Sequence, residues 1–229
     1  NIAIGRGAFA AADGTESLNI AIGRSAMGDS NATGMSKNIA IGHYSMDGAG
    51  TVGGSSDNIF IGYDAGGGTW TSGTCANNVA VGNYAMDAAM NSCNYSVAVG
   101  YGALGAVTVG DDSVCIGYLA GASIVTGQRN IAIGSEALTS AAGDCQDNLA
   151  LGYQALKNLN HNSSVRNIGI GRLAGGAMGT LAGNTDNIFL GYQAGSGTWA
   201  TAVSLRNVGV GSNTLDGALN GALDNTAVG

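Results

Sequence analysis

One short phrase, Asn-Ile-Ala-Ile-Gly in varied form, recurs along the whole 229-residue chain. The glycine that ends the phrase returns at intervals of 17 to 20 residues. A period this short holds one turn of chain and not a separate domain, so it predicts a solenoid in which each turn adds one strand to a growing sheet. These strand-end glycines are Gly5, Gly23, Gly42, Gly62, Gly82, Gly100, Gly117, Gly134, Gly152, Gly171, Gly191, Gly211 and Gly229.

The predicted fold is all-β, a parallel β-solenoid of thirteen turns that runs over residues 1–229 as a single continuous domain. A longer period is also present, because the segment 58–70 returns at 187–199, a shift of 129 residues or seven turns. Tandem copying of a seven-turn block accounts for this super-repeat. Neither end carries an atypical capping turn, so we expect an excerpt from a longer repeat fibre.

Composition excludes several classes of function. The net charge is −7 and only 10% of residues are charged, which argues against a nucleic-acid partner, since phosphates require a basic face. No apolar run approaches the roughly 20 residues of a membrane-spanning helix, so we expect no membrane insertion. The absence of proline suits a backbone whose N–H groups pair with the next turn.

Residues alternate between large and small in the three positions before each strand-end glycine. Ile, Val or Leu stands at the first and third positions, and the middle position is mostly Ala. This alternation predicts a strand whose large side chains fill the core and whose small residues face outward. A smooth outer strip would let another backbone approach closely, which favours a subunit interface over a merely solvated face. The candidate interface residues are Ala3, Ala21, Ala40, Ala80, Ala98, Ala132 and Ala150.

An asparagine stands four places before most of the strand-end glycines. Identical amides in register can hydrogen-bond along a stack, and asparagine tolerates the left-handed conformation of a corner. Both interpretations are structural. Ser96 and Ser113 take the position in two turns. The predicted structural ladder consists of Asn1, Asn19, Asn38, Asn58, Asn78, Asn130, Asn148, Asn167, Asn187, Asn207 and Asn225.

A bulky residue usually follows the strand-end glycine by four places, but four turns have glycine there. Those turns supply Trp70, Ile124, Met178 or Trp199 three or four residues later. We interpret this exchange as volume compensation within a close-packed core. The two tryptophans are therefore expected to fill the core before they serve as recognition residues.

Charge alternates in sign five places before successive strand-end glycines. Opposite charges on neighbouring strands attract and like charges repel, so this column predicts a charge ladder that helps to fix register. A merely solvated corner is the alternative. The column consists of Asp112, Arg129, Asp147, Arg166, Asp186, Arg206 and Asp224.

Tyrosine often directly follows the strand-end glycine, where it alternates with arginine or histidine. Tyr and Arg are favoured in binding surfaces, although both also tolerate a half-exposed strand edge. The candidate recognition residues are Tyr63, Tyr101, Tyr118, Tyr153 and Tyr192.

Three of the four cysteines share one column, seven places before a strand-end glycine. Cys75 and Cys93 occupy it in consecutive turns, which would bring their Cα atoms within the range of a disulfide. A reducing site of assembly would instead leave both as thiols. Cys115 lies in the small column of a strand and is expected to be a buried thiol.

No pattern predicts catalysis, a metal site or a cofactor. The chain has no Gly-x-Ser-x-Gly, no Cys-x-x-Cys and no glycine-rich loop that leads into a helix. His43 and His161 are far apart in turn number, so neither indicates a general base or a metal ligand. We therefore expect a protein that is not an enzyme and has no cofactor.

The phrases Asn-Ile-Ala-Ile-Gly, Asn-Thr-Ala-Val-Gly and, at residues 148–156, Asn-Leu-Ala-Leu-Gly-Tyr-Gln-Ala-Leu resemble two families of repeats. One is the repeat region of bacteriophage tail fibre proteins, and the other is the head of YadA-like trimeric autotransporter adhesins. The resemblance covers the whole chain and implies a left-handed parallel β-roll that assembles as a homotrimer. It offers no catalytic residues.

The resulting expectation is a structural shaft of an extracellular fibre, foremost a phage tail fibre that carries or supports host-receptor binding. The head of a bacterial trimeric adhesin is the alternative, and the location would then be a virion or a cell surface. An ice-binding solenoid is least favoured, because it would need a column of threonines that the sequence lacks. The expected partners are further copies of this chain and a host-cell receptor or glycan.

Overall fold

The computed structural model describes residues 1–12, 14–29, 33–49, 53–141, 143–159, 163–179, 183–197, 202–217 and 219–229, and these contain strands and turns but no helix. Each strand has three residues and ends just before a strand-end glycine. The strands are β1 (Ile2–Ile4), β2 (Ile20–Ile22), β3 (Ile39–Ile41), β4 (Ile59–Ile61), β5 (Val79–Val81), β6 (Val97–Val99), β7 (Val114–Ile116), β8 (Ile131–Ile133), β9 (Leu149–Leu151), β10 (Ile168–Ile170), β11 (Ile188–Leu190), β12 (Val208–Val210) and β13 (Thr226–Val228).

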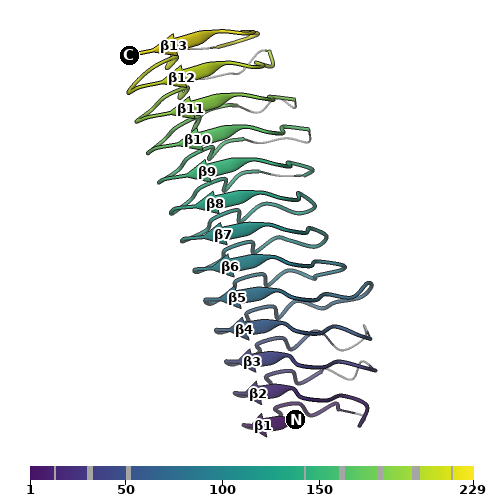
Figure 1. Cartoon of the computed structure of the whole chain (residues 1–229). Helices are drawn as coiled ribbons and strands as arrows, with labels where there is room; N and C mark the ends of the chain where they lie inside the picture. The colour runs from purple at the N-terminus through teal and green to yellow at the C-terminus, as the bar shows by residue number, and fades with distance from the viewer. Residues whose placement is uncertain are drawn as a thin grey trace. The chain divides into compact units, whose positions relative to one another are not determined.

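The strands form parallel ladders in sequence order within two compact units. The first unit, Asn1–Ser113, holds β1–β6, and the second, Val114–Gly229, holds β7–β13. Equivalent residues of successive repeats face one another, as Ala21 faces Ala40 in the first unit and Ala132 faces Ala150 in the second. Figure 1 shows a narrow turn after each strand that leads the chain back along a return limb. The predicted β-solenoid with one strand per repeat is therefore confirmed.

Three positions in each turn hold the left-handed backbone conformation. Around the turn that joins β3 to β4, these are Tyr44, Met46 and Asp57, with φ of 60°, 53° and 58°. For a residue other than glycine, this conformation costs about 1–2 kcal/mol. The cost is offset because each of the three N–H groups donates to a carbonyl of a neighbouring turn, at 2.9 to 3.2 Å. The left-handed corner precedes the asparagine of the phrase, so our assignment of that conformation to the asparagine was wrong.

The middle residue of each strand points into the core, which reverses the predicted orientation. Ala40 and Ala80 are fully buried, whereas Ile39 and Ile41 on either side are only half-buried. The predicted interface strip is therefore wrong, because a buried column cannot contact another subunit. Of Ala3, Ala21, Ala40, Ala80, Ala98, Ala132 and Ala150, all but the exposed Ala3 of the terminal strand have no accessible surface.

The return limb supplies the bulky half of the core and explains this reversal. Met46, Met86, Leu104 and Leu156, each four places after a strand-end glycine, are fully buried. They fill the space behind the strands, so the strand residue that faces them must be small if the interior is to reach native density. Alternation indicates which residues share a face of a strand, but it does not indicate which face points inward.

Phenylalanine in a strand is matched by glycine on the return limb. Phe60 and Phe189 replace the usual alanine and are fully buried. A Cβ at Gly66 would lie 3.1 Å from the ring of Phe60, and a Cβ at Gly195 would overlap the ring of Phe189. Both glycines also have φ near +60°, at 63° and 64°. Their lack of a side chain makes room for the phenylalanines.

The predicted volume compensation is confirmed where the structure describes it. Trp70, Ile124 and Met178 are fully buried, and the ring of Trp70 packs edge-on against Phe60 at 6.0 Å between centroids. Trp199 lies outside the described residues. The first tryptophan is thus a core residue and not a recognition residue.

Substitution of a strand-end glycine tests the spacing between turns. At Gly82, φ is 137° and an added Cβ would lie 2.5 Å from the carbonyl oxygen of Gly100 in the next turn. Gly82→Ala is therefore expected to destabilise the fold by at least about 3 kcal/mol, through backbone strain and steric overlap. Gly217→Ala is the control, because nothing lies within 4 Å of its added Cβ. Urea unfolding followed by circular dichroism measures both, and equal stability of the two variants would contradict this account.

Candidate functional site

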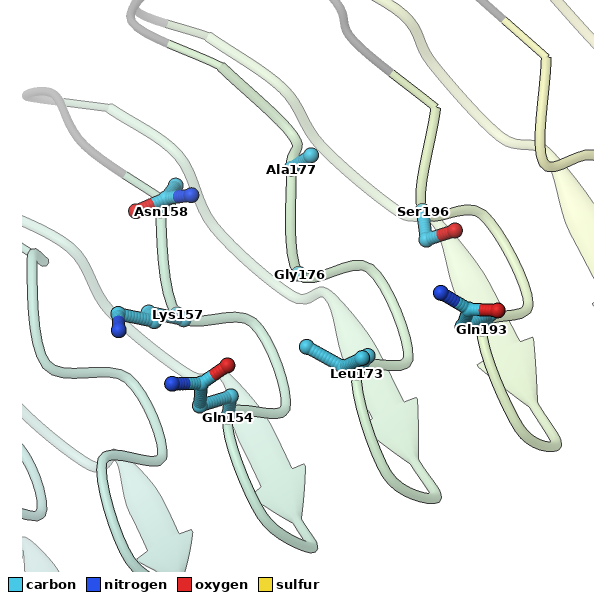
Figure 2. A pocket seen from close by; sticks show the side chains of 8 residues that line it. All are labelled: Gln154, Lys157, Asn158, Leu173, Gly176, Ala177, Gln193 and Ser196. Atoms are coloured by element: carbon cyan, nitrogen blue, oxygen red, sulfur yellow. The ribbon is translucent and has the colours of Figure 1, made fainter.

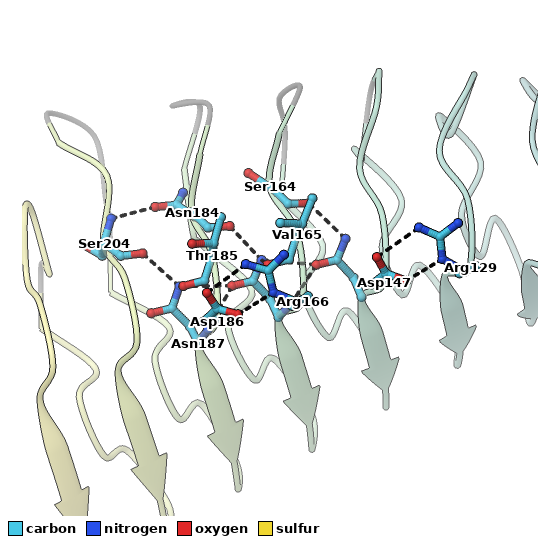
Figure 3. Close-up of polar contacts among 12 residues, drawn as sticks. Arg129, Asp147, Ser164, Val165, Arg166, Asn184, Thr185, Asp186, Asn187 and Ser204 are labelled. Atoms are coloured by element: carbon cyan, nitrogen blue, oxygen red, sulfur yellow. Dashed lines mark hydrogen bonds and ion pairs between the residues drawn. The ribbon is translucent and has the colours of Figure 1, made fainter.

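The asparagine column forms the predicted ladder of hydrogen bonds. Asn38 donates its backbone N–H and its Nδ2 to Oδ1 of Asn19, at 2.9 and 3.1 Å. The same Nδ2 also donates to the carbonyl of Ser55 in the following turn, at 3.0 Å. The pattern repeats in the second unit, where Asn187 donates to Asn167 and to the carbonyl of Ser204 (Figure 3). An amide suits this position because it carries both donors and an acceptor.

The two serines of the column keep part of this pattern. The backbone N–H of Ser96 donates to Oδ1 of Asn78 at 3.0 Å, and the N–H of Ser113 donates to Oγ of Ser96 at 3.3 Å. Each serine hydroxyl also donates to a carbonyl two residues earlier in its own turn. The ladder satisfies buried polar groups, which supports a structural role.

Removal of one amide from the ladder tests its contribution. Asn58 is fully buried, donates to Asn38 Oδ1 and the carbonyl of Cys75, and accepts from the N–H and Nδ2 of Asn78. Asn58→Ala is expected to lower the free energy of unfolding by about 2–4 kcal/mol, because it leaves buried donors and acceptors without partners. Asn58→Ser, which copies Ser96, is expected to cost less than half as much. Chemical denaturation ranks the two, and an equal loss would mean that packing alone matters at this position.

The charge ladder joins turns in pairs on the outside of the solenoid. Nε and Nη2 of Arg129 donate to Oδ1 and Oδ2 of Asp147 at 2.7 and 3.1 Å, and Arg166 grips Asp186 in the same way (Figure 3). A third pair joins Arg206 to Asp224. The predicted attraction between successive turns is confirmed for these pairs, and the column also contains a looser pair of Lys37 and Asp57 at 3.7 Å.

These ion pairs contribute more to the register between successive turns than to the stability of the fold. The hydrogen bonds from Arg166 lower the pKa of Asp186, and those from Arg206 lower the pKa of Asp224. All of the side chains are largely exposed, so each pair contributes no more than about 1 kcal/mol. Asp112, the first residue of the predicted ladder, has the left-handed backbone conformation that Asp57 has in the same column, with φ of 57°.

The four cysteines are free, buried thiols, so the disulfide considered between Cys75 and Cys93 is not formed. Their placement in adjacent turns is as predicted, because the N–H of Cys93 donates to Sγ of Cys75 at 3.4 Å. Burial raises the pKa of Cys93 and of Cys115 to about 12, which leaves both thiols protonated and unreactive. Cys115 is the buried thiol that its strand position predicts.

The tyrosines that follow the strand-end glycines are exposed, as a recognition role requires. Tyr63, Tyr101, Tyr118, Tyr153 and Tyr192 have exposed fractions from 38% to 51%. Exposure alone does not assign them a ligand.

Sequence reasoning missed the residues that complete this aromatic surface. Tyr44 and Tyr84, one place further along, bring their rings to 6.3 and 5.3 Å from Tyr63. His43 stacks on Tyr44 at 3.9 Å between ring centroids. The sequence carries no direct signal for these contacts, because the rings belong to different columns and meet only once the turns are stacked.

Three half-buried carboxylates of the first unit follow a strand-end glycine by two or five places. Burial and the charge of Asp29 raise the pKa of Asp47, and burial raises the pKa of Asp64, which His43 partly offsets. Burial, reinforced by the charge of Asp64, raises the pKa of Asp87 to about 6. At neutral pH the charged forms of these carboxylates therefore lower the stability of the folded state.

The raised pKa of Asp87 gives a pH dependence of known sign. Its ordinary value is 3.8 and its folded value is about 6, so protonation favours the folded state. The stabilisation is complete below about pH 4 and is lost as the pH rises through about 6. Asp87→Asn is therefore expected to raise the melting temperature at pH 7 and to leave it almost unchanged at pH 4. Thermal unfolding at both pH values measures this, with the exposed Asp216→Asn as control. A lower melting temperature of Asp87→Asn at pH 7 would contradict the assignment.

A shallow hollow of about 280 Å³ opens on the return limbs of the second unit, after β9, β10 and β11. Figure 2 shows Gln154 and Lys157 on one turn and Leu173 and Gly176 on the next. Glu136 binds both Gln154 Nε2 and Lys157 Nζ, which neutralises the lysine. The lining contains no histidine, cysteine or carboxylate, so it suits a small neutral molecule and not acid–base catalysis.

The outer strand face, formed by the first and third residues of every strand, is an apolar surface that each unit exposes. It carries Ile, Val or Leu at every position except Thr226. Ile61, Ile131 and Leu151 are 36%, 39% and 41% exposed in the interior of their units. The largest apolar patch on a soluble protein is often functional, and charged residues are absent from this one, so the face has the character of an interface.

No group of three or more His, Cys, Asp or Glu side chains among the described residues could hold a metal ion; His161 lies outside them. The part of the chain that the structure describes also has no helix long and apolar enough to cross a membrane. No family model, no curated protein and no solved structure matches this chain. The functional argument therefore rests on the residues themselves.

Proposed function

We propose that this chain is a structural shaft of an extracellular fibre, built from several copies that associate through the outer strand face. The observation that carries the proposal is the continuous column of half-exposed Ile, Val and Leu along each unit. Transfer of such surface out of water is worth about 25 cal/mol per Å². A single chain leaves the outer strand face in water and gains none of this free energy. Copies with the same repeat can bury the face of each unit against one another.

The size of the outer strand face sets how much of it must be buried for a stable association. A strand of three residues is about 10 Å long and adjacent strands lie about 4.8 Å apart, which gives roughly 290 Å² for β1–β6 and roughly 340 Å² for β7–β13. Two copies that pair through one unit would bury on the order of 600 Å² in total, below the roughly 1,000 Å² expected of a specific interface, so stable association needs the face of more than one unit. Charged residues are absent from the face, as is usual at the centre of interfaces.

Within this proposal the fibre is a phage tail fibre shaft, a homotrimer with a left-handed solenoid, that carries or supports host-receptor binding on a virion. The hand, the trimer and the location follow from the resemblance of the repeats. The 129-residue super-repeat, shared by Phe60 with Gly66 and Phe189 with Gly195, is proposed to come from tandem copying of seven turns. No catalytic function, cofactor, nucleic-acid partner or membrane insertion forms part of the proposal.

A bacterial surface adhesin head is the second candidate, because an apolar strand face would serve its assembly equally well. The two differ in flanking sequence, which would be a chaperone or virion attachment region in one case and a membrane anchor in the other. An ice-binding surface is not supported, since such surfaces need rows of threonine and the outer strand face has only Thr226.

Charged substitutions on the outer strand face test the assembly. Ile41→Lys combined with Val97→Lys is expected to convert a trimer into monomers at the same protein concentration, because each lysine would need to be desolvated at the interface. Sedimentation velocity measures the mass, and circular dichroism checks that the variant folds. Leu18→Lys is the matched control, since Leu18 is exposed outside the face in the column where Lys37 occurs naturally.

The outcomes separate the parts of the proposal. A mass of three chains that falls only in the double variant supports it in full. A mass of two chains with the same sensitivity would retain the interface and overturn the trimer. A wild-type monomer at tens of micromolar, or an oligomer that the double variant leaves intact, would contradict assembly through this face.

A further inference from the structure

The aromatic row, defined as Tyr63, Tyr84 and Tyr101, crosses three successive turns at the ends of β4, β5 and β6. Their ring centroids lie 5.3 Å apart between Tyr63 and Tyr84 and 5.5 Å apart between Tyr84 and Tyr101. The first and last rings are 38% and 49% exposed, and Tyr84 between them is half-buried. Aromatic side chains are among the most common binding anchors in proteins, and an exposed row of three is a surface that a ligand can cover.

Two carboxylates belong to the same turns as these rings. Asp64 follows Tyr63 in the chain, and Asp87 lies on the return limb of the turn that carries Tyr84. Neither carboxylate forms an ion pair with a lysine or arginine of the described residues. Both are half-buried, and the negative charge of Asp64 adds to burial in raising the pKa of Asp87. A cation placed between them would relieve this repulsion.

The second unit shows how a cation sits between tyrosines of this column. Tyr153, Arg172 and Tyr192 directly follow three successive strand-end glycines. The guanidinium carbon of Arg172 lies 5.7 Å from the ring centroid of Tyr153 and 5.5 Å from that of Tyr192, within the range of cation–π attraction. In the first unit the same three positions are Tyr63, Asn83 and Tyr101, so an uncharged residue stands where Arg172 would be.

We propose that the aromatic row, with Asp64 and Asp87, binds guanidinium or ammonium groups of a cationic polypeptide partner. Tyrosine rings attract the cation through their negative faces, and the two carboxylates complement its charge. The three rings follow one another across successive turns, so a peptide segment that runs along the row can bring more than one cationic side chain to it. An anionic ligand is disfavoured by the carboxylates, and a neutral glycan would hydrogen-bond to them without compensating their charge. The row lies beyond the strand ends, so the inference does not depend on assembly through the outer strand face.

A short arginine peptide, acetyl-Arg-Arg-Arg-amide, is the probe, and isothermal titration calorimetry at low and moderate salt is the measurement. Tyr84→Ala and Asp64→Asn are each expected to weaken binding by about tenfold, since one removes the central ring and the other a charge partner. Tyr95→Ala is the control, because Tyr95 is an exposed tyrosine of the same unit in a different column, 62% exposed. The control is expected to bind like the wild type.

Asn83→Arg provides a test that does not remove any of the proposed binding groups. Its guanidinium is expected to take the place that Arg172 holds in the second unit and so to block the row, with a loss of at least about tenfold in peptide affinity. Asn83→Gln loses the same hydrogen bond from the N–H of Tyr63 but adds no charge, so it should retain binding. Thermal unfolding confirms that both variants remain folded.

Each alternative outcome overturns the inference. No peptide binding to the wild type at millimolar concentration would overturn it, as would equal affinity of Asn83→Arg and Asn83→Gln. Binding that is lost in Tyr95→Ala as much as in Tyr84→Ala would show unspecific charge attraction. Tighter binding of a neutral oligosaccharide, chitohexaose, that depends on Tyr84 and not on Asp64 would assign the row to glycans instead.

Discussion

Backbone hydrogen bonds between successive turns hold each repeat residue in a column with its equivalents one repeat away. At the spacing of a β ladder, whatever occupies a column must tolerate its own neighbours. Asparagine does so in the interior, because an amide can donate to the turn before it while accepting from the turn after it. Aspartate cannot stack on aspartate, and the chain accordingly alternates it with arginine, as in the pair of Arg166 and Asp186.

The same constraint limits the thickness of the solenoid. Apart from the terminal Gly229, the strand-end glycines have φ between 126° and 144°, and the next turn lies too close for a Cβ, as at Gly82. The return limb comes back close behind the strand, and its Met46 and Leu156 fill the narrow interior. Alanine is then the residue that fits on the inner side of the strand. Phe60 fits there because Gly66, next to its ring, has no side chain. Large β-branched residues are consequently directed outward.

This inversion connects the packing to function. An outward column of Ile and Val is unfavourable in water but suits association with further copies of a chain that has the same period. The polar surfaces lie elsewhere, on the turns after the strands and on the return limbs. There the aromatic row, the carboxylates near Asp64 and the hollow near Gln154 offer different chemistry on a common scaffold. Variation in those columns can change a partner without disturbing the interior.

The sequence by itself determined the period, the strands, the asparagine ladder and the charge pairs, because each of these follows from residues that recur at a fixed interval. It also indicated that Trp70 replaces a missing bulky residue. Only the tertiary structure decided which side of the strand faces the core, because alternation is symmetric under that choice. The path of the return limb breaks the symmetry, since it determines how much space lies behind Ala40. The meeting of Tyr84 with Tyr63 likewise required the turns to be stacked, since these rings belong to different columns and come together only in space.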